Sequence, residues 1–282
     1  MDAIAGTALW TAAARARESA RPDRLFDDPL AEALAGEEGF LQLDAEPEEA
    51  QCNPWLPIRT RFFDDWLEQV TMRHGLRQVV LVAAGMDTRA FRLAWPAGVT
   101  LWEFDRPALL QRKEGILTAA RATPACDRRT LGVDLAQDDW PARLRAAGFD
   151  ATAPSAWLAE GFFHYLDAAA VERILATLAT VAAPGSQLGV DFLACDLLTS
   201  PWMAGYLHLL ERRGAPWRFG TNEPEALLAR HGWQALVRQP GEEGANFGRW
   251  PWPVTPRDLP GFPRCFLVTA RRQANGSEHL SS

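Results

Sequence analysis

Short apolar segments alternate with helix-like segments through the middle of the chain, and this alternation constrains the fold more than any other feature. The apolar segments are rich in β-branched and aromatic side chains, as buried strands are. They cover residues 78–83, 99–104, 129–133, 155–159 and 187–192. The segments between them have helical spacing and lie at 87–95, 107–121, 138–147 and 167–182. Because parallel neighbouring strands need crossovers of about a dozen residues, the sequence predicts an α/β fold with helices on both faces of a mostly parallel sheet.

Helices are also expected before this alternating region. Residues 10–20 and 28–34 are rich in helix formers, and Gly36 is expected to end the second segment. A loop rich in Glu and Pro is expected from 36 to 51. From Asn53 onward, apolar residues recur every four positions, which predicts an amphipathic helix.

The region after residue 192 departs from the alternating pattern. Helices are expected at 196–213 and 223–231, and strands at 233–238 and 265–270. A loop rich in Gly, Pro and Trp, residues 240–263, joins these two strands. Two late strands without a helix between them predict an antiparallel hairpin at the edge of the sheet, which brings the expected sheet to seven strands.

We expect these parts to form a single domain. It would comprise a helical N-terminal extension, a central core, a helical insert with the final strands, and a short tail. These parts cover residues 1–75, 76–192, 193–272 and 273–282.

The charge balance and the cysteines exclude several functional classes. The chain has 29 Lys and Arg against 36 Asp and Glu, a net charge of −7, which argues against binding to a nucleic-acid backbone. Its longest apolar stretches fall short of the ~20 residues that span a bilayer. The four cysteines form no Cys-x-x-Cys unit, and no metal-binding cluster is evident. The sequence therefore predicts a cytoplasmic protein that binds no nucleic acid, membrane or metal.

Acidic residues follow several of the expected strands. Asp105, Asp134 and Glu160 each lie within two residues of a predicted strand end. In an open parallel sheet, ligands bind at the carboxyl ends of the strands. We therefore expect these carboxylates to form a polar rim around one crevice.

The turn after the first expected strand contains a single glycine, Gly85, where a dinucleotide fingerprint would contain three. A pyrophosphate therefore has no evident binding loop. Asp105 lies 20 residues after Gly85, the spacing at which a carboxylate accepts hydrogen bonds from a ribose diol. The pattern fits either a nucleoside site or an ordinary strand-to-helix turn.

Five strings in order carry a resemblance to a known family. They are IRTRFFDDWL, VVLVAAGMDTRAFRL, LWEFDRPALLQRK, GVDLAQDDWPARLRAAGFD and PSAWLAEGFFHYLD. This region, residues 15–192, resembles the leucine carboxyl methyltransferase family, and most closely its bacterial branch of S-adenosylmethionine-dependent O-methyltransferases. The resemblance implies a Rossmann-like class I methyltransferase fold and S-adenosylmethionine as the cofactor.

The resemblance also assigns roles to individual residues. It places Ala83 and Gly85 at the methionine part of the cofactor, with Ala83 standing where the family has a glycine. It places Asp105 at the ribose of the cofactor, and Asp134 and Leu135 at the adenine. It places Glu160 at the amino group of the methionine part and Arg59 at its carboxylate. Arg24 is the candidate for a further basic residue from the N-terminal region.

The expected reaction is direct in-line transfer of a methyl group, which needs alignment and a dry site but no metal. A carboxylic acid is ionised at neutral pH and needs no base, whereas a phenol usually does. His164 is the candidate general base. Tyr165, which matches the tyrosine of the family's AE-xxx-Y motif, is the second candidate catalytic residue.

The acceptor is expected to bind outside the core sheet. Trp202, Tyr206 and Trp217 in the insert are candidate walls for a flat or apolar acceptor. Phe247, Trp250 and Trp252 in the long loop are candidates for its rim or lid. We predict an O-methyltransferase acting on a carboxylate or hydroxyl of a small, natural-product-like molecule. The alternatives are a protein C-terminal carboxyl methyltransferase, a nicotinamide-dependent oxidoreductase, and a partner-binding protein that has lost turnover.

Overall fold

The computed structural model describes residues 3–46, 51, 53–135 and 139–274 of the 282-residue chain. Seven strands form one sheet. The central strands have short, nearly continuous apolar sequences, which place them in the core. Their bounds are β1 Gln78–Val82, β2 Thr100–Asp105, β3 Asp127–Gly132, β4 Ala156–Ala159, β5 Gln187–Leu193, β6 Trp233–Arg238 and β7 Cys265–Arg272.

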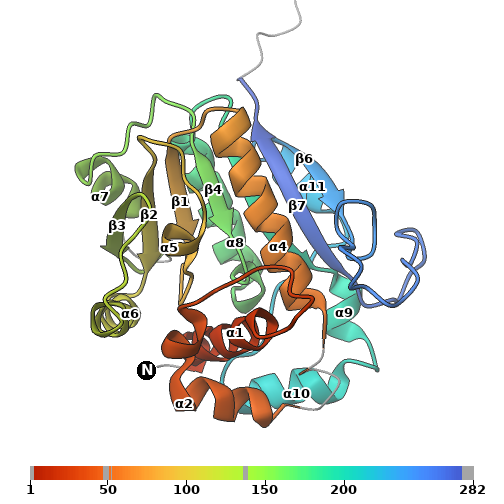
Figure 1. The fold of residues 1–282 in the computed structure, drawn as a ribbon. Coiled ribbons are helices and arrows are strands. Elements are labelled where there is room, and N and C mark those ends of the chain that lie inside the picture. Colours follow the sequence, from red (N-terminus) through yellow and green to blue (C-terminus); the bar gives the residue numbers. More distant parts are fainter. Residues whose placement is uncertain (1–2, 47–50, 52, 136–138, 275–282) are drawn as a thin grey trace, which may run out of the picture.

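The strand order is β3-β2-β1-β4-β5-β7-β6 (Figure 1). Strands β1 to β5 pair in parallel, whereas β7 is antiparallel to both of its neighbours, β5 and β6. The predicted parallel core and the antiparallel pairing of the two late strands are confirmed. The chain reverses its order between β1 and β4, where an open α/β sheet forms its ligand crevice.

The helices surround this sheet on both faces and at one end. They are α1 Ala3–Ser19, α2 Ala31–Asp44, α4 Trp55–Glu68, α5 Arg89–Arg92, α6 Pro107–Ala119, α7 Trp140–Ala146, α8 Ala168–Val181, α9 Cys195–Thr199, α10 Ala204–Arg212 and α11 Pro224–Ala229. A π-helical turn (Gln69–Arg73) continues α4, and a 3₁₀ turn (Phe163–Tyr165) follows β4. In the part of the chain that the structure describes, every helix is too short or too polar to cross a bilayer.

The two faces of β1 pack against different helices because successive side chains of a strand point in opposite directions. Val79 and Leu81 lie in one buried cluster with the apolar residues of α4. Val80 and Val82 lie in another with the apolar residues of α8. Helix α4 accordingly crosses one face of the sheet and α8 the other, while α1, α2 and α10 gather at one end (Figure 1).

A second helical segment follows Gly36, so the loop predicted to begin there is wrong as far as Asp44. Gly36 itself has the non-helical angles φ +56° and ψ −176°, so it ends the first helical segment as predicted, and a kink separates the two halves of α2. Glycine has no Cβ, so this left-handed backbone costs it little. The second half of α2 is held by packing: Leu43 is buried in a cluster with Leu9 and Ala12 of α1. Such a tertiary contact has no local sequence signal.

Two other predicted helices differ from the observed ones. The segment predicted as helix 87–95 forms only the four-residue α5. The segment predicted as helix 196–213 is divided into α9 and α10, because Ser200 precedes Pro201 and is extended, with φ −68° and ψ 128°. Asp138, the expected start of α7, lies outside the described residues, and Asp139 caps that helix by accepting from the Ala142 amide.

A fully buried ion cluster joins β2 to α6 and β3. Glu103 and Lys113 are both 0% exposed, and Lys113 Nζ lies 2.7 Å from Glu103 Oε2. Arg128 donates to both carboxylate oxygens at 2.8 and 2.7 Å. Glu103 therefore acts within the scaffold and not in a ligand site.

Candidate functional site

A cavity of about 2420 Å³ lies at the carboxyl edge of the sheet. Its floor is formed by the ends of β1, β2 and β4, and its walls come from α1, α2, α4, α10 and the loop between β6 and β7. The volume exceeds the ~300–1,000 Å³ of an ordinary small-molecule pocket. The cavity can therefore hold two molecules side by side, such as a cofactor and an acceptor.

The turn after β1 enters the cavity through two left-handed residues. Ala83 has φ +54° and Gly85 has φ +50°. A Cβ added to Gly85 would also lie 3.2 Å from the Cβ of Ala8 in α1. Gly85 therefore suits this turn, whereas Ala83 holds a backbone conformation that is unfavourable for a residue with a side chain.

Ala83→Gly is expected to raise the free energy of unfolding by about 0.5–1 kcal/mol, because removing the left-handed strain outweighs the added entropy of the unfolded chain. Urea unfolding measures the change. Ala84→Gly is the matched control: Ala84 has no positive φ, so this variant should lose about 0.5–1 kcal/mol. An equal loss in both variants would show that Ala83 is not strained.

Asp105, at the end of β2, is fixed beside this turn. Its Oδ2 accepts from the Gly85 amide at 2.7 Å, and its Oδ1 accepts from the Arg106 amide at 2.7 Å. Burial raises the pKa of Asp105, although the two amide hydrogen bonds oppose the shift. The carboxylate lines the cavity next to Gly85, as the 20-residue spacing predicted.

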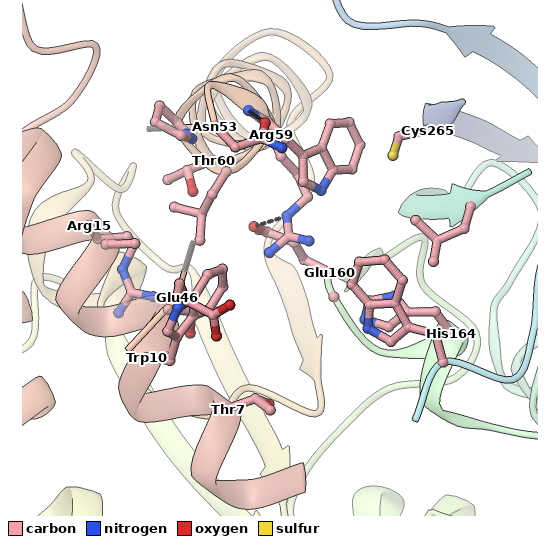
Figure 2. Close-up of a pocket in the computed structure, with 18 of the residues that line it drawn as sticks. Thr7, Trp10, Arg15, Glu46, Asn53, Arg59, Thr60, Glu160, His164 and Cys265 are labelled. Atoms are coloured by element: carbon pink, nitrogen blue, oxygen red, sulfur yellow. Dashed lines mark hydrogen bonds and ion pairs between the residues drawn. The ribbon is translucent and has the colours of Figure 1, made fainter. Parts of the chain in front are cut away.

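Glu160, after β4, pairs with two buried arginines. Arg59 Nε on α4 lies 2.9 Å from Glu160 Oε1 (Figure 2). Arg89 Nη2 lies 2.8 Å from Glu160 Oε2. Arg59 also donates to Asp191 Oδ2 at 3.2 Å. Burial alone would raise the pKa of Glu160, but the charges of Arg89 and Arg59 outweigh burial and hold that pKa below its usual value. Glu160 and Arg59 thus form an ion pair on the cavity wall.

This geometry settles how Arg59 is paired. A simple helix-surface pair with Asp64 or Asp65 is not formed. Asp64 instead accepts from Arg89 Nε at 2.7 Å, and Asp65 accepts from Arg61 Nε at 2.7 Å. Arg59 is 8% exposed, and its charge is directed to the strand ends across from α4.

His164 and Tyr165 lie on the cavity wall beyond Glu160, as Figure 2 shows for His164. Burial, with a smaller contribution from the charge of Arg59, lowers the pKa of His164 to about 3. The imidazole is therefore neutral at pH 7, and a group of such low pKa is a poor general base. Burial raises the pKa of Tyr165, against the effect of a hydrogen bond with Thr7.

The predicted adenine contacts lie next to the cavity but do not line it. Asp134 and Leu135 follow β3, and the Val133 amide just before them donates to the Asp105 carbonyl at 2.8 Å. Arg24 does not line the cavity either, and its Nε lies 4.0 Å from Asp27 Oδ1. The other predicted site residues all line one cavity. They lie on α4, on the turn after β1, and at or just after the ends of β2 and β4: Arg59, Ala83, Gly85, Asp105, Glu160, His164 and Tyr165.

Arg15 on α1 was not singled out from the sequence. It lines the cavity, donates from Nε to Asp28 Oδ2 at 2.9 Å and donates to the Met86 carbonyl beyond the glycine turn. The available signal was weak, because Arg15 is one of several arginines in an alanine-rich segment. Only the folded chain brings it beside Gly85.

Aromatic side chains from the insert and the long loop also line the cavity. Five of the six expected residues lie on its walls, namely Trp202, Tyr206, Trp217, Trp250 and Trp252. The sixth, Phe247, does not line the cavity, and its ring centre lies 5.8 Å from the Arg61 guanidinium carbon. Over residues 3–46, 51, 53–135 and 139–274, no group of three His, Cys, Asp or Glu side chains is placed to hold a metal ion.

Comparison with known proteins gives consistent relationships. The sequence pattern of the leucine carboxyl methyltransferase family matches residues 8–179. A Streptomyces coelicolor protein is 40% identical over 281 residues, which cover 94% of this chain and 95% of the relative. A Mycobacteroides abscessus protein is 44% identical over 199 residues, so that the match covers 68% of this chain and 64% of the relative. Both relatives are named "Putative S-adenosyl-L-methionine-dependent methyltransferase".

A solved structure shares the fold. The crystal structure of a DUF574 family protein from Streptomyces avermitilis has a TM-score of 0.62 at 17% identity, and the match covers 93% of this chain and 96% of that one. The family match and the relatives agree with each other. The chain therefore belongs to the leucine carboxyl methyltransferase family of S-adenosylmethionine-dependent methyltransferases.

Proposed function

We propose that the enzyme methylates an oxygen atom, of a carboxylate or a hydroxyl, on a small acceptor that resembles a natural product. One observation carries the proposal: Gly85, Asp105 and Glu160, from three different strand ends, line a single cavity that aromatic side chains also line. The strand-end residues suit a nucleoside cofactor. The aromatic side chains suit a flat or apolar acceptor.

The residues present fit S-adenosylmethionine. Asp105 has a carboxylate on the cavity wall that can accept from ribose hydroxyls, and Gly85 leaves the adjacent backbone open. Glu160 can face an ammonium group, while Arg15 and Arg59 supply positive charge for a carboxylate. Asp134 and Leu135 remain the proposed adenine contacts at the end of β3. When bound, this cofactor supplies a methyl group activated by a positively charged sulfur.

The protein's contribution is alignment and exclusion of water. The acceptor enters between α1, α2, α10 and the 239–264 loop, all of which line the cavity. Holding two reactants in line lowers the entropic part of the barrier, and a dry site strengthens electrostatic attraction. No metal is needed for such a transfer in this proposal.

A second candidate is methylation of a protein C-terminal carboxylate. The description of the matching family favours it. The aromatic lining favours a small acceptor instead, because a peptide terminus would require polar partners along its backbone. The family assignment argues against the nicotinamide-dependent alternative.

Saturating S-adenosylhomocysteine, the demethylated cofactor, is expected to raise the melting temperature by about 5 °C, whereas NAD should not change it. Ligand at 100 times its dissociation constant adds about 2.7 kcal/mol of stability. Differential scanning fluorimetry measures both shifts, and the protein supplied with S-adenosylmethionine can then be tested for methyl transfer to small acids and phenols. Stabilisation by NAD alone would overturn the proposed function, and no response to either ligand would favour a protein that has lost turnover.

A further inference from the structure

Glu46, just beyond α2, is a buried carboxylate on the acceptor side of the cavity. Its side chain is 3% exposed, and Oε1 forms an ion pair with Arg213 at the end of α10. Oε2 has no hydrogen-bond partner among the described residues. Glu46 lines the cavity, across from His164 in the view of Figure 2. A carboxylate oxygen this buried normally accepts a hydrogen bond.

An aromatic wall runs from the region of Glu46 to the family motif after β4. The rings of Tyr206 and Trp217 lie 5.5 Å apart, those of Trp217 and His164 lie 5.2 Å apart, and those of His164 and Tyr165 lie 4.3 Å apart. Burial, followed by the negative charge of Glu46, raises the pKa of Tyr206, so Glu46 lies within electrostatic range of this wall. All of these residues line the cavity.

A further buried polar atom on this wall is unsatisfied: His164 Nδ1 has no partner in the described part of the chain. The Trp217 side chain, in contrast, forms a hydrogen bond with Tyr165. Buried polar atoms in native proteins are nearly always paired, so the unpaired atoms of Glu46 and His164 indicate a ligand that supplies the missing bonds. The ionised Glu46 oxygen can only accept a hydrogen bond.

We infer that Glu46, His164 and Trp217 form a subsite for an aromatic alcohol, with the alcohol's hydroxyl donating to Glu46. The inference rests on the proposed function and narrows its acceptor. A hydroxyl group has a proton that it can donate to Glu46 Oε2 in a hydrogen bond. An ionised carboxylate on the acceptor has no such proton, and its negative charge would repel that of Glu46. The wall of Tyr206 and Trp217 provides stacking surfaces for the ring. Glu46 is thus a residue that selects hydroxyl acceptors over carboxylate acceptors.

The test measures binding to protein saturated with S-adenosylhomocysteine, by isothermal titration calorimetry. The probes are quinolin-6-ol, quinoline and quinoline-6-carboxylate, which share a ring system and differ in the polar group. The wild-type protein should bind quinolin-6-ol about 10-fold tighter than the other two. E46Q, which removes the charge with little change in shape, should weaken quinolin-6-ol about 10-fold and leave quinoline unchanged.

Two control variants separate this effect from structural damage. Glu38→Gln makes the same change at a half-exposed cavity residue that pairs with Arg112, and it should retain the preference for quinolin-6-ol. Arg213→Lys keeps a positive partner for the buried Glu46 carboxylate, and it should retain the preference as well. Loss of the preference in Arg213→Lys would assign the effect to the ion-pair geometry and overturn the inference.

The remaining outcomes are distinct. Equal affinity of the wild type for quinolin-6-ol and quinoline, or an unchanged affinity in E46Q, contradicts the subsite. S-adenosylhomocysteine binding, measured first in every variant, tests the proposed function separately. If the wild type failed to bind it, the proposed function would fail. Normal binding together with an insensitive E46Q would leave that function intact and remove only this inference.

Discussion

Asp105→Ala is expected to weaken binding of S-adenosylhomocysteine by about 100-fold or more. The substitution removes a charged acceptor for two ribose hydroxyls, and each such hydrogen bond contributes about 1.5–3 kcal/mol. It also removes the partner of the Gly85 amide, so the turn after β1 loses its support. Isothermal titration calorimetry on the purified variant measures the loss.

Asp127→Ala is the matched control for Asp105→Ala. Asp127 begins the neighbouring strand β3, its side chain is 51% exposed, and it pairs with Arg129. Because it lies outside the cavity lining, the affinity should stay within about twofold of the wild type. An unchanged affinity in Asp105→Ala, with its melting temperature retained, would remove Asp105 from the cofactor site.

Glu103→Gln is expected to lower the free energy of unfolding by about 3–5 kcal/mol. The change leaves the 0% exposed Lys113 ammonium without its anionic partner, and a buried uncompensated charge is strongly destabilising. Urea unfolding, monitored by tryptophan fluorescence, gives the free energy of unfolding. It also shows whether the dependence of that free energy on urea concentration is the same as in the wild type.

The double substitution Glu103→Leu with Lys113→Met should recover part of this loss, because apolar residues of similar size replace both members of the pair and Arg128 keeps Glu114 as its partner. Glu114→Gln provides the exposed comparison: Glu114 pairs with Arg128, but its side chain is 45% exposed. That variant should change stability by less than about 1 kcal/mol. A Glu103→Gln variant as stable as Glu114→Gln would show that the buried pair contributes little.

The sheet could be predicted because the burial of each strand is visible in the strand's own sequence. Each central strand is covered on both faces, so its sequence is a short and nearly continuous apolar run. Helix limits were harder to predict where distant residues decide them. Leu43 holds the second half of α2 through a contact with α1, and α5 is short although residues 87–95 have helical spacing.

The site divides in the same way. Gly85 and Asp105 were predictable because their spacing follows from the strand–helix–strand unit that contains both. Arg15 and Glu46 reach the cavity only through the packing of α1, α2 and α10 at one end of the sheet (Figure 1). Glu46 follows a helix, has no motif around it, and pairs with a residue 167 positions away. No local pattern could indicate it.

The position of β7 between β5 and β6 has a consequence for biosynthesis. β6 pairs with no strand other than β7 in the described sheet, and β7 is the last of the strands to leave the ribosome. Until then, one edge of β5 and the whole of β6 lack a partner strand in the described sheet, and open strand edges are sites for mispairing. The β5–β7–β6 part of the sheet is therefore completed late. Translation arrest before residue 265 should yield an aggregation-prone intermediate even though every proposed cofactor-binding residue has already been synthesised.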